Sequence, residues 1–113
     1  GGSNIIKLRG RSSFQSPAYN AVKMIEAAMG GEKFTLPAGC YVNCDKCGYK
    51  NVMMAMPTII DATGVHFTAP AGTEEELASL SKSYEHLCKM RDEIVGLGII
   101  PPVAEWKKMN PNL

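Results

Sequence analysis

A long amphipathic helix near the C-terminus is the sequence feature that most constrains the fold. Thr73 and Glu76 have the spacing of a capping box, which marks a helix start, and Pro101-Pro102 prevents the helix from continuing. Between them, apolar residues at three- and four-residue spacing predict a helix over residues 74–97. Its expected buried stripe consists of Leu77, Leu80, Tyr84, Leu87, Ile94 and Leu97. Such a stripe must be covered by another layer of structure.

Three segments before this helix have the composition of β-strands. Residues 34–42, 52–60 and 65–68 are rich in aromatic and β-branched residues. The polar segment 43–51 separates the first two, and the turn Asp61-Ala62-Thr63-Gly64 leads into the third. The sequence therefore predicts an α+β fold in which helices pack on an antiparallel sheet meander of three strands.

The N-terminal segment is expected to hold one helix end and one helix start. Apolar residues precede Gly10, which is placed to end a helix. Ser16 is then positioned to cap a second helix over residues 17–29, with Pro17 in its first turn. Because the chain opens inside a helix, we expect it to be the later part of a larger protein.

The second helix has one continuous apolar face. That face consists of Ala18, Ala21, Val22, Ile25, Ala28 and Met29. We expect it to pack in the core. Because its many alanines permit close approach to another backbone, helix 17–29 is also our candidate for a subunit contact.

Composition excludes several classes of partner and suggests a compartment. Twelve basic and 11 acidic residues give a net charge of +1, which creates no broad field attracting nucleic acid or an anionic membrane. The apolar runs are shorter than the roughly 20 residues of a spanning helix. No secretory signal opens the chain, so its four cysteines are interpreted as reduced thiols in the cytoplasm.

We expect one domain over residues 1–100 and an extended tail over residues 101–113.

Three cysteines suggest an alternative function. Cys44 and Cys47 stand in a C-x-x-C-G pattern like that of a zinc knuckle, and Cys40 is close in sequence, so the alternative hypothesis is a small zinc-stabilised interaction module. A closed structural zinc site needs four ligands, however, and the second pair is missing. His86 and Cys88 would point to different faces of a helix. A redox role is also disfavoured, because the pair does not stand at a strand-to-helix junction.

Other catalytic patterns are missing from the sequence. His66 and His86 have no serine, cysteine or carboxylate arranged around them as a nucleophile pattern, and we interpret both as surface residues. No glycine-rich phosphate loop is present. From its residues alone, the chain does not supply a complete active site, and we assign it no catalytic and no metal-binding residue.

The opening segment carries a family resemblance. The stretch from Ile5-Ile6-Lys7-Leu8 through Gly10 to Ser12-Ser13-Phe14-x-Ser16-Pro17-Ala18 resembles the substrate-domain helix pair of the lactate/malate dehydrogenase family. The remaining elements follow in the family's order as far as Leu97. The amino-acid sequence of this segment is most similar to a bacterial branch of NAD-dependent malate dehydrogenases. Arg11 and Phe14 stand where lactate dehydrogenases usually have an aromatic residue and a tryptophan, which favours malate over lactate.

The resemblance implies a fold and two site residues. It implies a lactate/malate dehydrogenase C-terminal domain without its Rossmann half. Ser12 would line the substrate pocket, and Ser16 would lie beside the nicotinamide of NAD. If the helix started at Ser12, the two hydroxyls would be four residues apart on one helical face. The alternative is that both hydroxyls only cap the helix.

The resemblance also implies what lies outside this chain. An N-terminal Rossmann domain would bind most of the NAD and bring the catalytic histidine, its aspartate partner and the substrate-binding arginines. We therefore expect a C-terminal fragment that is inactive by itself. The intact enzyme would interconvert malate and oxaloacetate by hydride transfer. It would act in the tricarboxylic acid cycle, and we expect it to be a dimer.

Overall fold

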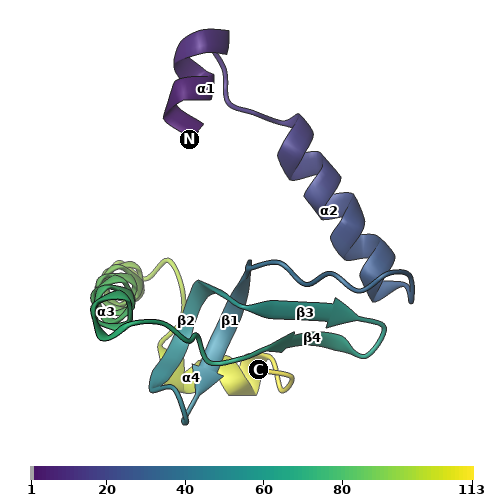
Figure 1. The fold of residues 1–113 in the computed structure, drawn as a ribbon. Helices are drawn as coiled ribbons and strands as arrows, with labels where there is room; N and C mark the ends of the chain where they lie inside the picture. Colours follow the sequence, from purple (N-terminus) through teal and green to yellow (C-terminus); the bar gives the residue numbers. More distant parts are fainter. Residues whose placement is uncertain (1) are drawn as a thin grey trace. The chain divides into compact units, whose positions relative to one another are not determined.

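The computed structural model describes residues 2–113. They form two units, which are described separately: one runs up to Leu36 and includes Thr58–His66, and the other comprises Pro37–Pro57 and Phe67–Leu113. Helices and small antiparallel sheets occur in the order α1, α2, β1, β2, β3, β4, α3, α4 (Figure 1). The predicted α+β class is confirmed. Within residues 2–113, no helix is both long enough and apolar enough to cross a membrane.

The first unit begins with two helices, α1 (Gly2–Arg9) and α2 (Gln15–Ala28). Gly10 ends α1 as predicted: its φ is +68°, and its amide donates to the Ile6 carbonyl at 2.8 Å. The predicted cap of α2 is wrong. The Ala18 amide donates to the carbonyl of Phe14, which makes Phe14 the N-cap and places Ser16 inside the first turn.

The apolar face of α2 is exposed within this unit. Only Ala27 is buried on α2, and α2 contacts β3. Large apolar side chains on α2 and at its C-cap remain exposed: Tyr19, Val22, Ile25 and Met29, between 53% and 83% exposed. The expectation that the predicted face packs in the core is therefore wrong, because every residue of that face is exposed.

The first unit also contains the hairpin of β3 (Thr58–Asp61) and β4 (Gly64–Phe67), of which Phe67 belongs to the second unit. Phe34 extends this small sheet by an antiparallel bridge to Ile60, with N–O distances of 3.1 and 2.9 Å. Phe34, Thr58 and Ile60 are buried. This short aromatic and β-branched core positions the turn between β3 and β4.

The second unit is built on the hairpin of β1 (Ala38–Cys44) and β2 (Tyr49–Met56). Burial alternates along both strands, as expected when one face of a sheet is covered. The residues of the buried face are Cys40, Val42, Tyr49, Val52, Met54 and Met56. Val42 pairs with Val52 and Cys40 with Met54, so the register keeps the apolar side chains on one face.

The predicted three-strand meander is wrong, because the strands form two separate two-stranded sheets. Each long predicted strand is interrupted by a proline: Pro37 precedes β1, and Pro57 separates β2 from β3. Proline has no N–H to donate to a neighbouring strand, so it ends a ladder of hydrogen bonds. The sequence composition predicted the extended segments but not these breaks.

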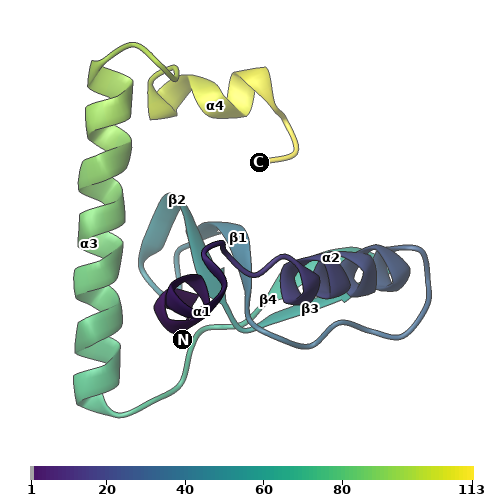
Figure 2. The same cartoon turned by 90° about the horizontal axis from the view of Figure 1, so that it is seen from above.

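Helix α3 (Glu74–Gly96) covers the apolar face of the β1–β2 hairpin (Figure 1 and Figure 2). Its predicted capping box is confirmed: the Glu76 amide donates to Thr73 Oγ1 at 3.2 Å, and the Thr73 amide donates to Glu76 Oε2 at 2.8 Å. Leu80, Tyr84 and Leu87 pack half-buried against the hairpin. Leu77 and Leu97, predicted to be buried, are 38% and 69% exposed because they lie near the ends of the helix, beyond that contact.

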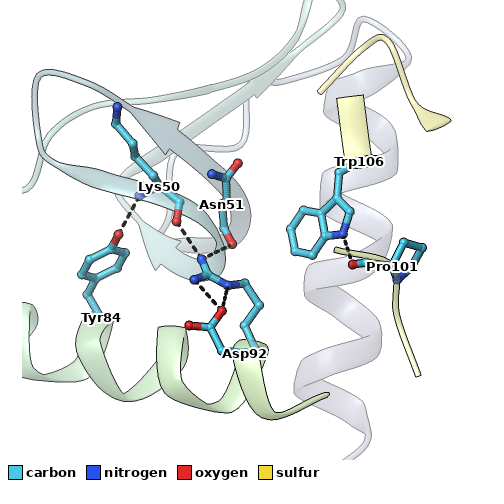
Figure 3. Close-up of polar contacts among 7 residues, drawn as sticks. Lys50, Asn51, Tyr84, Asp92, Pro101 and Trp106 are labelled. Carbon is cyan, nitrogen blue, oxygen red and sulfur yellow. Dashed lines mark hydrogen bonds and ion pairs between the residues drawn. The ribbon is translucent and has the colours of Figure 1, made fainter. Parts of the chain in front are cut away.

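An arginine on α3 holds an irregular residue of β2. A register shift after Val42 leaves Asn51 without a partner in β1, and Asn51 has a φ of +55°. Arg91 donates to the carbonyls of Lys50 and Asn51 at 3.3 and 3.0 Å (Figure 3). The Lys50 amide donates to the Tyr84 hydroxyl at 3.2 Å. Carbonyls that the bulge leaves free of the ladder are thus satisfied by the helix.

The tail forms a short helix, α4 (Val103–Met109), so the predicted extended tail is wrong in conformation. Pro101-Pro102 stops α3, but Pro102 is itself the N-cap of α4. Trp106 then folds back, and its Nε1 donates to the Pro101 carbonyl at 2.7 Å (Figure 3). Its ring centre also lies 6.3 Å from that of Tyr41. The proline pair therefore separates two helices.

Replacing Arg91 should destabilise the second unit. Arg91→Gln cannot span to the carbonyls of Lys50 and Asn51, so those acceptors lose a charged donor, at a cost of about 1–3 kcal/mol in unfolding free energy. Urea unfolding followed by circular dichroism measures this change. Lys89→Gln, at an exposed position of the same helix, is the matched control. Equal midpoints for Arg91→Gln and the unchanged chain would contradict the proposed anchoring.

Candidate functional site

The two serines suggested by the family resemblance lie around the start of α2. Ser12 is in the irregular connection between α1 and α2, and Ser16 is in the first turn of α2. The expectation that both occupy one helical face is wrong, because the helix begins at Gln15 and leaves Ser12 outside it. Both residues are exposed.

Neither serine hydroxyl caps α2. The N-cap Phe14 has no side-chain cap bond, and within residues 2–113 neither the Ser12 nor the Ser16 hydroxyl hydrogen-bonds another protein group. The alternative that both serve only as caps thus finds no support in the described residues. Both hydroxyls remain able to donate to, or accept from, a bound molecule.

Two arginines and one aromatic ring organise the connection. The guanidinium carbons of Arg9 and Arg11 lie 5.9 and 5.0 Å from the centre of the Phe14 ring. Cation–π attraction draws each guanidinium to the ring face. Sequence reasoning missed this cluster, although the two arginines that flank Gly10, three and five positions before Phe14, were a usable signal.

This segment can bind but carries no group for proton transfer. Its hydroxyls offer hydrogen bonds to a carbonyl or carboxylate, and Arg9 and Arg11 contribute positive charge beside Ser12. Arginine stays protonated at every physiological pH, so it does not act as a base. The chemistry available here is recognition of an anionic, oxygen-rich molecule.

The cysteines do not form a metal centre. Cys44 ends β1 and Cys47 lies in the turn to β2, whereas Cys40 is buried in the hairpin core. Among residues 2–113, no three histidine, cysteine, aspartate or glutamate side chains gather in a group that could hold a metal ion. The zinc-stabilised module is therefore not supported.

A polar cluster occupies the turn between β3 and β4. Thr63 donates from its amide and its hydroxyl to Asp61 Oδ1, at 2.8 and 2.5 Å. The same hydroxyl lies 2.8 Å from His66 Nε2, which is 3.5 Å from Asp61 Oδ1. Sequence reasoning missed that Asp61 and Thr63 surround His66, although all three belong to one short hairpin.

The proton arrangement argues against a nucleophile at Thr63. Because the hydroxyl proton points to Asp61, His66 Nε2 must be the donor to Thr63 Oγ1 and cannot accept its proton. The hydrogen bonds from Thr63, with smaller contributions from His66 and Lys33, lower the pKa of Asp61. The cluster therefore stabilises the turn. His86 lies exposed on α3, in agreement with its interpretation as a surface residue.

Comparison with known proteins decides the family. The pattern of the lactate/malate dehydrogenase alpha/beta C-terminal domain matches residues 1–96. The chain belongs to the lactate/malate dehydrogenase family. The resemblance predicted from the opening segment is confirmed, and the match extends from α1 to the end of α3.

Curated relatives in this family are bacterial malate dehydrogenases. The chain is 36% identical over 87 residues to the enzyme of Geobacillus kaustophilus and 34% identical over 89 residues to that of Sorangium cellulosum. Each alignment covers 75% of this chain and 28% of the relative. The chain thus aligns with little more than a quarter of the length of these malate dehydrogenases.

Asp61 should make stability depend on pH in the acid range. Its pKa is lowered from 3.8 in the folded state, so its stabilising contribution is complete well above pH 3.8 and is lost as the pH falls through the lowered value. Asp61→Asn lacks this contribution. The difference in unfolding free energy between the two chains should therefore be largest near pH 6 and shrink toward about pH 2.

Urea titrations across this pH range measure the difference. Glu105→Gln, at an exposed position of α4, controls for the loss of a carboxylate. A difference for Asp61→Asn that stays constant with pH would contradict the assignment.

Proposed function

We propose that this chain is the substrate-side domain of a malate dehydrogenase, which in the intact protein interconverts malate and oxaloacetate by hydride transfer with NAD. The observation that carries the proposal is the family match over residues 1–96, together with identities of about one third to bacterial malate dehydrogenases. Cytoplasmic location and a place in the tricarboxylic acid cycle belong to the same proposal. Both rest on the resemblance.

Ser12 is proposed as a wall of the substrate pocket. Its exposed hydroxyl makes no hydrogen bond within residues 2–113, and Arg9 and Arg11 lie nearby on the same segment. Oxaloacetate and malate are dicarboxylates, so positive charge beside a hydroxyl donor suits them electrostatically. The hydroxyl of Ser12 would orient the oxygen-bearing end of the substrate.

Ser16 is proposed to contact the nicotinamide end of NAD. Its hydroxyl is exposed in the first turn of α2 and has no partner within the described residues, which fits a contact with a polar carboxamide. NAD supplies the hydride acceptor of the reaction. The chain contributes orientation only, and the larger part of the cofactor would be held by a Rossmann domain.

Catalytic groups are proposed to come from that other domain. In the segment around Ser12 and Ser16 no residue can act as acid or base. The histidine, aspartate and arginines that the family resemblance implies would therefore face this wall from the Rossmann half. The 113-residue chain alone is expected to be inactive.

Helix α2 is proposed as the contact of a homodimer. Its exposed stripe consists of Tyr19, Val22, Ile25 and the C-cap residue Met29, which follow one another at three- and four-residue spacing and so lie along one side of the helix. Such surfaces on a soluble protein mark contacts with another chain or domain. This assigns the contact to the large apolar side chains of the helix rather than to its alanines.

Replacing Ser12 should weaken catalysis in the reconstituted enzyme. Ser12→Ala, in the chain joined to its N-terminal half, removes one hydrogen bond worth about 0.5–1.5 kcal/mol. We expect kcat/KM for oxaloacetate to fall roughly 2- to 12-fold, with a smaller effect on NADH binding. Stopped-flow absorbance of NADH measures the rate.

Ser13→Ala is the matched control, because Ser13 is the adjacent, half-buried serine. It should leave kcat/KM within about twofold of the parent. Unchanged oxaloacetate turnover in Ser12→Ala would remove Ser12 from the site. A reconstituted protein without any malate dehydrogenase activity would overturn the proposed function itself.

Breaking the α2 stripe should dissociate the dimer. Ile25→Glu places a charge in the middle of the exposed apolar stripe, and loss of a central anchor costs about 2 kcal/mol or more. We expect dimerisation of the reconstituted enzyme to weaken roughly 30-fold, as measured by analytical ultracentrifugation. Ser79→Glu adds the same charge to an exposed position of α3 and should change nothing. Equal dissociation constants for both variants would contradict the interface.

A further inference from the structure

The turn between β1 and β2 brings two thiols together. Within this turn the Cys47 amide donates to Cys44 Sγ at 3.3 Å, and the Cys47 thiol donates to the Cys44 carbonyl at 3.9 Å. The Gly48 amide closes the turn on the same carbonyl at 3.1 Å, with a φ of +75° at Gly48. The backbone of the hairpin therefore folds one cysteine over the other.

The surroundings of the two sulfur atoms differ. Hydrogen bonds from the Cys47 side chain, and then from the amides of Cys47 and Lys46, lower the pKa of Cys44, although burial and the neighbouring Asp45 carboxylate oppose them. Asp45 is itself paired with Lys50. Burial, followed by the hydrogen bond to Cys44, raises the pKa of Cys47. Cys44 is thus the better thiolate and Cys47 the better-protected thiol.

The other cysteines are placed differently. Cys40 is buried in the hairpin core and donates to the Ala38 carbonyl at 3.3 Å. Cys88 packs against the same core from α3. Cys44 and Cys47 are half-buried and stand at the tip of the hairpin, within reach of a reagent in solution.

We propose that Cys44 and Cys47 are a reversible thiol–disulfide site, with Cys44 as the attacking thiolate and Cys47 as the resolving thiol. The site takes small disulfides as its oxidants. The sequence pattern disfavoured a redox role because no helix follows the pair. In the structure, amides of the hairpin turn point at Cys44 Sγ and supply the stabilisation that a helix N-terminus supplies elsewhere.

The reaction is an ordinary thiol–disulfide exchange. The Cys44 thiolate attacks one sulfur of a small disulfide, forming a mixed disulfide and releasing the other half as a thiolate. Cys47 then loses its proton to solvent and attacks Cys44 Sγ, which releases the second thiolate. The protein loses two electrons and two protons, and the reagent is reduced to two thiols.

The site is distinct from the proposed substrate and cofactor contacts, because both cysteines and the hydrogen bonds between them lie in the second unit, whereas Ser12 and Ser16 lie in the first. Both side chains also pack against the buried face of the β1–β2 hairpin. Forming the bond would therefore alter the packing at the tip of the hairpin.

Peptide mapping of the 113-residue chain tests the proposal. The chain is equilibrated with oxidised glutathione, its remaining thiols are alkylated, and it is digested with trypsin. Trypsin cleaves after Lys46, between the two cysteines, so a disulfide keeps the two flanking peptides linked. We expect linked peptides whose fragmentation places the bond between Cys44 and Cys47, and two separate peptides after reduction.

Three variants separate the roles of the cysteines. Cys47→Ser should accumulate a stable glutathione adduct on Cys44, because no resolving thiol follows. Cys44→Ser should react several-fold more slowly with glutathione disulfide. Cys88→Ser, which changes another half-buried cysteine, should form the Cys44–Cys47 bond as the parent does.

Two results would overturn the proposal. One is full alkylation of Cys44 and Cys47 in the oxidised, unsubstituted chain. The other is a bond from Cys44 to Cys40 or Cys88 in place of Cys47. Both outcomes are read from the unsubstituted chain, so they do not depend on whether a variant folds.

Discussion

The second unit depends on the burial of one face of a two-stranded hairpin. Two strands alone are marginally stable in water, because they expose their apolar face on one side. Here that face, centred on Val42 and Met56, is covered by α3. The helix also satisfies backbone groups at the bulge through Arg91. Helix α3 therefore both covers the apolar face of the hairpin and hydrogen-bonds its bulge. If either contact were lost, water would gain access to the groups that the other contact involves.

Local signals in the sequence predicted the end of α1 and the start of α3. The capping box of α3 and the glycine after α1 act through bonds between near neighbours in the chain, so their patterns carry over directly into structure. The strands were harder to predict. A proline at position 37 or 57 breaks a ladder whose partner is distant in sequence, and composition contains no information about that partner. In the tail, Trp106 of α4 likewise contacts a residue distant in sequence, Tyr41.

For the proposed site, the sequence supplied candidate residues but not their arrangement. The family resemblance suggested Ser12 and Ser16, but the prediction that both lie on one helical face is wrong, because α2 begins at Gln15. The cysteine pair shows the opposite case. Its spacing was visible in the sequence, whereas the environment of Cys44 depends on amides that the turn orients. At both sites, the serine pair and the cysteine pair, the surroundings of the side chains follow from the geometry of the backbone. Residue types alone specify that geometry only weakly.

The docking of Trp106 has a practical consequence. It is the single tryptophan of the chain, and it belongs to α4, beyond the region that the family pattern matches. Its ring lies against Tyr41 of the β1–β2 hairpin, and its indole nitrogen is bonded to Pro101. Indole fluorescence shifts to longer wavelength when the ring becomes exposed to water. The emission of this one residue is therefore an intrinsic optical probe of whether the tail is seated on the hairpin, without any added label.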